Sequence, residues 1–178
     1  QRDGAPTVSA PDRHVFSYCP HCRTALQSLR EGEQQRPLCP ACGFVQYLNP
    51  VPGAGAIIRR AGRLCLVRRK YAPKAGQWTL PTGFMEWSED IATTAIREVR
   101  EETGLEVAID RLHSVQTGIL PPDLPVVVVF YEVTETGGRL VAGDDAAQVG
   151  FFALNDLPGP IAFAAHRRVI EALAREGP

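Results

Sequence analysis

The sequence predicts an α/β fold, in which two helices cover a mixed β-sheet as an α/β/α sandwich, with a small module in front of it. Between residues 53 and 175, segments with the apolar pattern of strands alternate with two segments of helical periodicity, which is the element order of such a sandwich. The chain has 178 residues, of which 44% are hydrophobic, so it can hold one ordinary domain with a packed core and one small module.

Composition sets the predicted domain boundaries. Residues 1–14 are rich in Pro, Ala, Asp and Ser, so we expect a flexible tail there. Residues 15–47 are expected to form the small module, and residues 48–178 the main domain. The segment Asn49-Pro50-Val51-Pro52 is predicted to be a stiff linker, because each proline restricts the residue before it to extended conformations.

The main domain is expected to open with a β-hairpin, residues 53–60 and 63–70, joined at Ala61-Gly62. Further strands are expected at residues 106–117, 125–135 and 149–154. The second of these contains the continuous apolar run Val126–Tyr131, which is typical of a buried strand. An amphipathic helix over residues 164–175 would close the domain.

Four cysteines of the small module form two Cys-x2-Cys pairs with sixteen residues between them: Cys19 and Cys22, then Cys39 and Cys42. This spacing is typical of a structural zinc site, in which four thiolates close a tetrahedron around Zn²⁺. The module would then be a zinc ribbon, folded by its metal because it is too short to bury its own core. Two disulfides or free thiols are the alternatives. The sequence carries no secretory signal, so we expect a cytoplasmic, reducing location, which favours the metal.

The first helix of the main domain is predicted within residues 83–105, which have the sequence GFMEWSEDIATTAIREVREETGL. Ser88 is the expected N-cap, Glu89 and Asp90 would lie in the first turn, and Gly104 is expected to end the helix. An apolar stripe with helical spacing should face the core and consists of Ile91, Ala92, Ala95, Ile96 and Val99.

Three glutamates of this helix are expected on the face opposite the apolar stripe. Glu98, Glu101 and Glu102 are three and four residues apart, which brings their carboxylates within about 6 Å of one another. Each like-charged pair at this spacing destabilises a helix by roughly 0.2–0.5 kcal/mol, and a divalent cation would remove the repulsion. A cluster of hard oxygen ligands favours Mg²⁺ or Mn²⁺. The alternative is an ordinary solvated helix face.

The spacing G-x5-E-x7-R-E-V-x-E-E-x-G-L across residues 83–105 resembles the Nudix box, the signature of hydrolases that cut nucleoside diphosphates linked to another moiety. The sandwich predicted above is also the fold of that family. The resemblance implies that Glu98, Glu101 and Glu102 are catalytic and bind the catalytic metal, with the backbone carbonyl of Thr82 as a further ligand.

The same resemblance implies structural roles for four other residues of the box. Glu89 and Arg97 would form a salt bridge that braces the loop against the helix, while Gly83 and Gly104 would hold fixed backbone positions. Thr82 departs from the family pattern, in which a second glycine is common at this place, and so does the Trp87-Ser88 pair.

A pyrophosphate bridge suits such a site, because metal ions neutralise the phosphates and lower the pKa of a bound water. A carboxylate must then take the proton of that water. Several family members use a glutamate from a later loop, but this chain has Gln148 there, and an amide is not a base. Glu101 or Glu102 is therefore the expected base, with Asp144 or Asp145 as weaker alternatives.

Arg68 and Arg69 end the second hairpin strand just before the box, so at least one should point towards the substrate phosphates, and the resemblance favours Arg69. A ribbon in front of a Nudix domain resembles the NADH pyrophosphatases and a group linked to FAD and ADP-ribose cleavage. The S-Q-P-W-P-F-P-x-S run of the NADH group is missing after the box. Pro121 stands sixteen residues past Leu105, a spacing associated with ADP-ribose hydrolases.

The sequence therefore favours hydrolysis of ADP-ribose or FAD to AMP and a second monophosphate, over two alternatives: an NADH pyrophosphatase and a non-catalytic nucleotide-binding regulator. The expected partner is a small nucleotide. A formal net charge of −1 gives no general attraction to nucleic acid, so nucleic acid is not expected as a partner. No membrane-spanning run is present, and two copies could pair as a homodimer.

Overall fold

The computed structural model of the protein describes residues 15–31, 34–143 and 145–176. These residues fall into two compact units that divide between Asn49 and Pro50. The flexible tail predicted for residues 1–14 lies outside the described residues. Each unit is described by itself below.

The smaller unit is a two-stranded hairpin between two cysteine loops. Strand β1 (Gln27–Glu31) pairs antiparallel with β2 (Gln34–Leu38), and isolated bridges join Tyr18 to Ala25 and Leu38 to Val45. These strands were not predicted, because QSLRE and QQRPL lack the alternation of apolar residues that marks a strand. A hairpin of this size is marginal by itself in water. The cysteine loops must therefore supply much of its stability.

The larger unit is built on a mixed sheet of seven strands among the described residues. The order is β5-β4-β3-β8-β7, with β6 beside β3 and β9 beside β4. Strands β3 and β8 are parallel, and the other neighbouring pairs are antiparallel. The strands are β3 (Val51–Arg60), β4 (Arg63–Arg69), β5 (Trp78–Thr79), β6 (Thr82–Phe84), β7 (Leu105–Leu120), β8 (Leu124–Gly138) and β9 (Ala146–Ala153).

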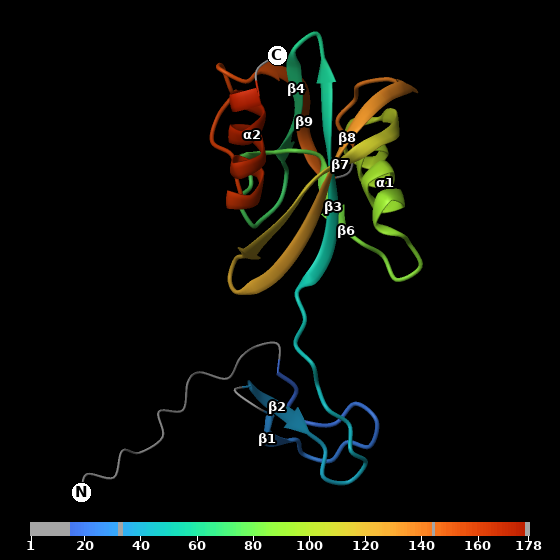
Figure 1. Ribbon diagram of the computed structural model, residues 1–178, viewed down its shortest axis with the longest axis vertical. Helices are drawn as coiled ribbons and strands as arrows, with labels where there is room; N and C mark the ends of the chain where they lie inside the picture. Colours follow the sequence, from blue (N-terminus) through green and yellow to red (C-terminus); the bar gives the residue numbers. More distant parts are fainter. Residues whose placement is uncertain (1–14, 32–33, 144, 177–178) are drawn as a thin grey trace, which may run out of the picture. The chain divides into compact units, whose positions relative to one another are not determined.

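Helix α1 (Ile91–Thr103) and helix α2 (Ala164–Glu176) cover opposite faces of this sheet, as Figure 1 shows. On the α2 side, Val169 and Leu173 pack in one core cluster with Phe130 of β8. On the α1 side, Val99 packs in a second cluster with Ile58 of β3. The predicted α/β/α sandwich is thus confirmed.

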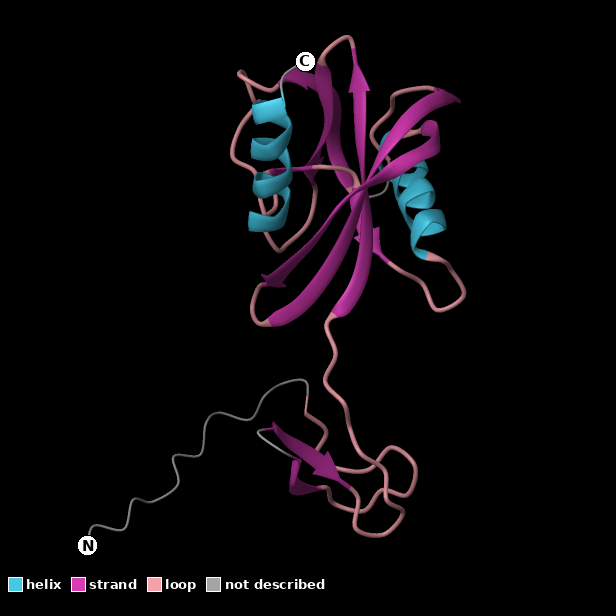
Figure 2. Cartoon of the chain, viewed as in Figure 1, coloured by secondary structure: helices cyan, strands magenta, loops and turns pink. Residues whose placement is uncertain are grey.

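The predicted strands of the main domain are present, with longer bounds for β3, β7, β8 and β9. Strand β3 begins at Val51, so the second half of the predicted linker belongs to the sheet. Strands β7 and β8 form a long antiparallel ribbon that crosses the sheet (Figure 2), and its register shifts at three places along β7. The run Val126–Tyr131 alternates between fully and partly buried residues, because one face of β8 packs against the α2 layer. The sequence analysis missed β5 and β6, which have only two and three residues.

Several details predicted for helix α1 are wrong. Glu89 and Asp90 precede its first residue, Ile91, and so do not lie in the first turn. The N-cap is Asp90 rather than Ser88: the Asp90 carboxylate accepts hydrogen bonds from the backbone N–H groups of Ala92 and Thr93. Ile96 is 37% exposed, whereas Glu102 is only 9% exposed. Glu102 follows Ala95 by two helical turns and therefore lies on the face that packs against the sheet, not on the opposite one.

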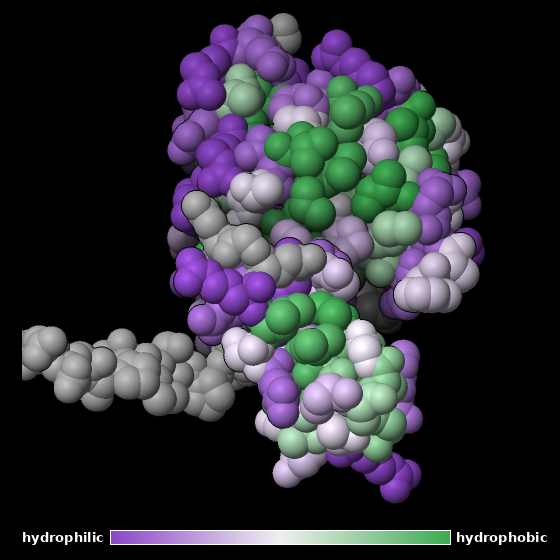
Figure 3. Space-filling view, turned by 60° about the horizontal axis from the view of Figure 1, so that its bottom comes forward, coloured by the Kyte–Doolittle hydropathy of each residue, from purple (hydrophilic) through white to green (hydrophobic). Residues whose placement is uncertain are grey.

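Part of the sheet surface is apolar and exposed. Leu112, Val115 and Ile119 of β7 are 55%, 55% and 70% exposed, and Val115 lies opposite Val129 of β8. Figure 3 shows apolar side chains gathered on one surface of the sandwich. A second copy could pack on such a face, but the expected homodimer stays a prediction. Among the described residues, neither helix has the length and apolar character needed to cross a membrane.

The end of helix α1 gives a first testable prediction. Gly104 has φ 69°, and a Cβ added there would lie 2.5 Å from the Arg139 carbonyl oxygen. Gly62 has φ 74°, but a Cβ there would meet no atom within 4 Å. Gly104→Ala should therefore lower the free energy of unfolding by about 2 kcal/mol or more, and Gly62→Ala by about 1 kcal/mol. Urea denaturation of both variants checks this. Equal losses would show that the Arg139 carbonyl contact does not constrain the helix end.

Candidate active site

Strand β6 and helix α1 approach so closely that a side chain at Gly83 would displace the Glu98 carboxylate. A Cβ added to Gly83 would overlap the carboxylate of Glu98, whose side chain is only 13% exposed. Gly83 therefore leaves room for the Glu98 carboxylate directly against the strand. This is the physical reason for a glycine at the position that the box pattern fixes.

Glu102 lies next to the same strand. Its Oε2 accepts a hydrogen bond of 3.0 Å from the backbone N–H of Thr82. Burial, helped by the nearby charges of Glu98 and Asp145, raises the pKa of Glu102 to about 8, although the Thr82 bond and Arg69 favour the ionised form. Burial also raises the pKa of Glu98. Both carboxylates are thus held in a place where negative charge is disfavoured unless a cation accompanies it.

Arg97 is bonded to three carboxylates, not only to the one expected. Its Nε donates to Glu89 Oε1 at 2.6 Å, which is the predicted salt bridge, and its Nη1 donates to Glu98 at 2.6 Å and to Glu101 at 2.8 Å. Nη2 also donates to the Phe84 carbonyl at 2.9 Å. The Arg97 bonds hold the pKa of Glu89 down at about 2. One guanidinium therefore links the loop after β6 to the helix and orients two proposed metal ligands.

An open hollow of about 660 Å³ collects the acidic groups, and we call it the acidic pocket. It is lined by Lys70, Tyr71, Glu98, Glu101, Glu102 and Asp145. The structure thus brings the three predicted glutamates together and adds Asp145, one of the weaker candidates for the base. Asp144, the other candidate, lies outside the described residues. Gln148 pairs with Arg68 across β9 and β4 and does not line this pocket.

The acidic pocket fits a divalent cation by the chemistry of its donors. Four carboxylates converge on it, two of them largely buried, whereas Lys70 is the one cationic side chain among its lining residues. Repulsion and burial both destabilise this set as anions, and a hard dication relieves both effects. The hollow is also open enough for a metal to keep positions for water and substrate oxygens. Thr82, the expected carbonyl ligand, is next to it through its bond to Glu102.

A second hollow, the apolar cavity, lies on the other side of Thr82 and Gly83, which line it. Its volume is about 270 Å³, and its walls include Phe84, Leu120, Val126, Val128, Phe163 and His166. Arg69 also lines it: the guanidinium lies over the Phe163 ring, 5.1 Å from its centre, and Nε donates to the Pro73 carbonyl at 2.8 Å. Only Thr82 and Gly83 of β6 would separate a flat ring in this cavity from the carboxylates of the acidic pocket.

The other two predicted substrate contacts lie outside both hollows. Arg68 points to the loop after β4, where its Nε donates to the Gly76 carbonyl at 3.0 Å. Pro121 is in the exposed turn between β7 and β8, next to Leu120 of the apolar cavity. Arg69 is therefore the arginine that the fold brings to the site.

The sequence analysis missed His166, a residue of helix α2 that is only 4% exposed. Its Nδ1 accepts a hydrogen bond of 3.2 Å from the backbone N–H of Leu80. Burial lowers the pKa of His166 to about 3, with further lowering by Arg69 and Arg167, so the ring is neutral at ordinary pH. A polar residue in the apolar pattern of α2 was the available signal, but its partner Leu80 is 86 residues away.

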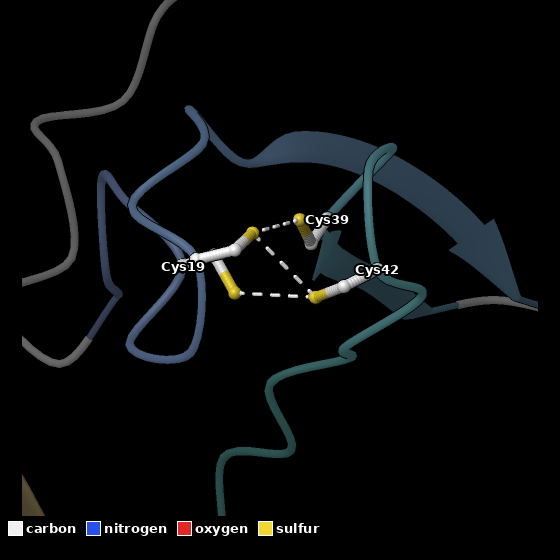
Figure 4. Close-up of side chains that lie close together, drawn as sticks. Cys19, Cys39 and Cys42 are labelled. Carbon is white, nitrogen blue, oxygen red and sulfur yellow. Dashed lines mark hydrogen bonds between the residues drawn. The ribbon is translucent and has the colours of Figure 1, made fainter.

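In the smaller unit, the sulfur atoms of the four cysteines all lie within 4.8 Å of one another (Figure 4). The Sγ–Sγ distances are 3.4 Å for Cys22–Cys39, 3.6 Å for Cys19–Cys42 and 3.7 Å for Cys22–Cys42. Tetrahedral Zn–S bonds of 2.3 Å place neighbouring sulfurs about 3.8 Å apart. None of the cysteines is in a disulfide. The cluster therefore fits a zinc ribbon, and it leaves no ligand position free for catalysis.

Comparison with known proteins agrees with this geometry. The family model described as NUDIX domain matches residues 49–173. The ADP-ribose pyrophosphatase of Methanocaldococcus jannaschii is 35% identical over 72% of this chain and 76% of its own length. The NAD-capped RNA hydrolase NudC of Pseudomonas aeruginosa is 28% identical over 79% of this chain, which spans only 49% of that protein. The crystal structure of a NUDIX hydrolase from Nitrosomonas europaea has a TM-score of 0.77 with 28% identity, covering 90% and 92% of the two chains.

The raised pKa of Glu102 predicts how stability depends on pH without added divalent cations. Below pH 4.5 the carboxyl is protonated in both the folded and unfolded states, so it has no effect. Between pH 4.5 and about 8 only the unfolded state loses the proton, so the folded state becomes less stable as pH rises. Glu102→Gln should remove this loss and be more stable than the parent at pH 8, by about 2–4 kcal/mol.

Urea denaturation at pH 5 and pH 8 measures this difference, and Glu171→Gln on the exposed part of helix α2 is the matched control. Excess Mg²⁺ should stabilise the parent more than Glu102→Gln at pH 8. An equal difference in stability at the two pH values would contradict the buried state of this carboxylate.

Proposed function

The chain belongs to the NUDIX family and is a hydrolase of nucleotide pyrophosphate bonds, and we propose that ADP-ribose or FAD is the substrate it cuts. The products would be AMP and a second monophosphate. The observation that carries the proposal is the acidic pocket beside the apolar cavity, because one substrate can place its diphosphate in the first and a flat ring in the second.

Glu98, Glu101 and Glu102 would hold Mg²⁺ or Mn²⁺, with the Thr82 carbonyl as a further ligand. When bound, such a cation neutralises the diphosphate and lowers the pKa of a water molecule. The residues of this chain do the positioning. Arg97 fixes the directions of Glu98 and Glu101, and the Thr82 N–H fixes that of Glu102.

Glu101 or Glu102 would take the proton of the attacking water. A general base works best when its pKa lies near the working pH, and burial moves Glu102 in that direction. Asp145 is the alternative base, because it lines the same pocket and no glutamate stands at residue 148. If Asp145 is the base, its substitution should remove turnover but leave the metal bound. If Glu101 or Glu102 is the base, substitution of Asp145 should leave turnover in place.

Arg69 is the proposed contact to the substrate phosphates, because it lies between the two hollows: it lines the apolar cavity, and its charge acts on Glu102. Arg68 and Pro121 are weaker candidates for contact with the substrate, since neither lines the acidic pocket or the apolar cavity. The name of the Methanocaldococcus relative supports ADP-ribose. The resemblance to the ribbon-bearing group linked to FAD and ADP-ribose cleavage supports FAD as well. NADH, the alternative from the sequence, is the less favoured substrate, and the NudC relative is named for hydrolysis of NAD-capped RNA.

Zn²⁺ in the smaller unit is part of the same proposal. The two cysteine loops have the same backbone hydrogen bonds, each from an N–H to a carbonyl oxygen. In the first loop Cys19 donates to Thr24 and Arg23 donates to Cys19. In the second loop Cys39 donates to Phe44 and Gly43 donates to Cys39. These bonds turn both pairs of thiolates towards one centre. The metal would then replace the apolar core that a hairpin of this size lacks.

The substrate proposal predicts the outcome of a simple assay. With Mg²⁺ or Mn²⁺, the protein should release AMP from ADP-ribose or FAD faster than from NADH, and Glu102→Gln should reduce turnover by at least a hundredfold, because it removes both a ligand and a base. Glu171→Gln should keep the parent rate. Separation of the nucleotide products measures each rate.

If Glu102→Gln stayed within tenfold of the parent, the assignment of Glu102 would fail. If no monophosphate appeared from any of the three nucleotides, the substrate class would be wrong for this chain.

The zinc proposal predicts one equivalent of bound zinc per chain. Cys39→Ser should lose that zinc, because a site with three thiolates binds far less tightly, while Cys65→Ser should keep it, since Cys65 is buried in the sandwich core. Elemental analysis of the purified proteins measures the ratio. Full zinc content in Cys39→Ser would contradict the four-cysteine site.

A further inference from the structure

The apolar cavity contains one polar group whose hydrogen-bonding state the fold determines. The Nδ1 atom of His166 faces the backbone N–H of Leu80 at 3.2 Å. A backbone N–H can only donate, so Nδ1 must be the acceptor and carry no proton. A neutral imidazole has one ring proton, which must then be on Nε2. Helix α2 and Leu80, which directly follows β5, thus select one tautomer of His166.

The ring proton of His166 has no acceptor within the described residues. No hydrogen bond of Nε2 occurs among them, although the side chain is only 4% exposed. The ring instead touches two phenyl groups, with centres 5.2 Å from Phe130 and 5.7 Å from Phe163. A buried donor without an acceptor destabilises a protein, because it has lost its bond to water and gained none in return. Such a group calls for a partner, and His166 lines the apolar cavity.

The cavity has the dimensions and walls of a site for one flat ring. Its volume of about 270 Å³ lies just below the roughly 300–1,000 Å³ of pockets that enclose whole drug-sized ligands. Phe84, Phe163, Val126 and Val128 supply aromatic and aliphatic surface to its walls. Among its lining residues, Arg69 and His166 carry N–H donor groups. Arg69 is already bonded to the Pro73 carbonyl, so a purely hydrocarbon occupant would leave the ring N–H of His166 without an acceptor.

We propose that His166 is a specificity-determining residue, whose Nε2–H donates a hydrogen bond to an acceptor nitrogen on the edge of a nucleobase in the apolar cavity. The proposal rests on the proposed function and deepens it. The diphosphate would then lie across Thr82 and Gly83, at the carboxylates. Bases that present an acceptor to His166 are retained, and those that present a donor or a C–H group there are discriminated against.

Equilibrium binding of AMP in the presence of Mg²⁺ tests this inference without relying on turnover. The 1-deaza, 3-deaza and 7-deaza analogues of AMP each replace one acceptor nitrogen of adenine by C–H. The parent protein should bind one of the three about five- to tenfold more weakly than AMP, and the other two about as well as AMP. That pattern would also identify the ring edge that faces His166.

Two substitutions separate recognition from structure. His166→Phe removes the donor and should bind AMP and all three analogues with equal, weaker affinity. His166→Gln can accept from Leu80 and still donate, so it should restore the preference seen with the parent protein. Melting temperatures of both variants show whether they are folded under the assay conditions.

Failure of the inference is distinct from failure of the proposed function. If the parent bound AMP and all three analogues equally, or bound none of them, the inference would be overturned, and the Nε2–H would belong to the contact with Phe130. The same holds if His166→Phe kept the preference. Normal binding preferences without hydrolysis of any nucleotide would instead count against the proposed function alone.

Discussion

The close contact between strand β6 and helix α1 is the constraint on which the candidate active site depends. Gly83 has no side chain, so the Glu98 carboxylate can lie against the strand, and the Thr82 N–H reaches Glu102. The strand is held there by β3, where a Cβ on Gly53 would come within 2.7 Å of the Gly83 carbonyl oxygen. Backbone positions set by glycines thus decide where two buried carboxylates lie.

This packing has an electrostatic consequence. Helix α1 directs Glu98 and Glu102 towards the sheet, where burial raises the pKa of each carboxyl. Arg97 offsets part of the negative charge and orients the groups, but it is one guanidinium against three carboxylates bonded to it. A divalent cation would balance the remaining negative charge. The adjoining apolar cavity has no carboxylate among its lining residues, and in the proposed function it would select the rest of the substrate.

The sequence predicted the positions of the glutamates because helical spacing places residues three and four apart together. It did not predict the burial of Glu102, because a charged side chain is expected to face solvent. Glu102 follows the buried Ala95 by seven positions, or two helical turns, and so lies on the same face. Asp90 replaced Ser88 as the cap because its carboxylate reaches two free N–H groups. His166 could not be found, since its role depends on Leu80, which only the folded chain brings near it.

The central claim is that β6 and α1 together hold a divalent cation at the carboxylates, and the position of that cation is the most direct measurement. Crystals of the protein grown with Mn²⁺ would show it by anomalous scattering. The account predicts a peak within about 2–2.5 Å of carboxylate oxygens from at least two of Glu98, Glu101 and Glu102. A peak elsewhere with these carboxylates unchanged, or none at Mn²⁺ concentrations that support hydrolysis, would contradict it.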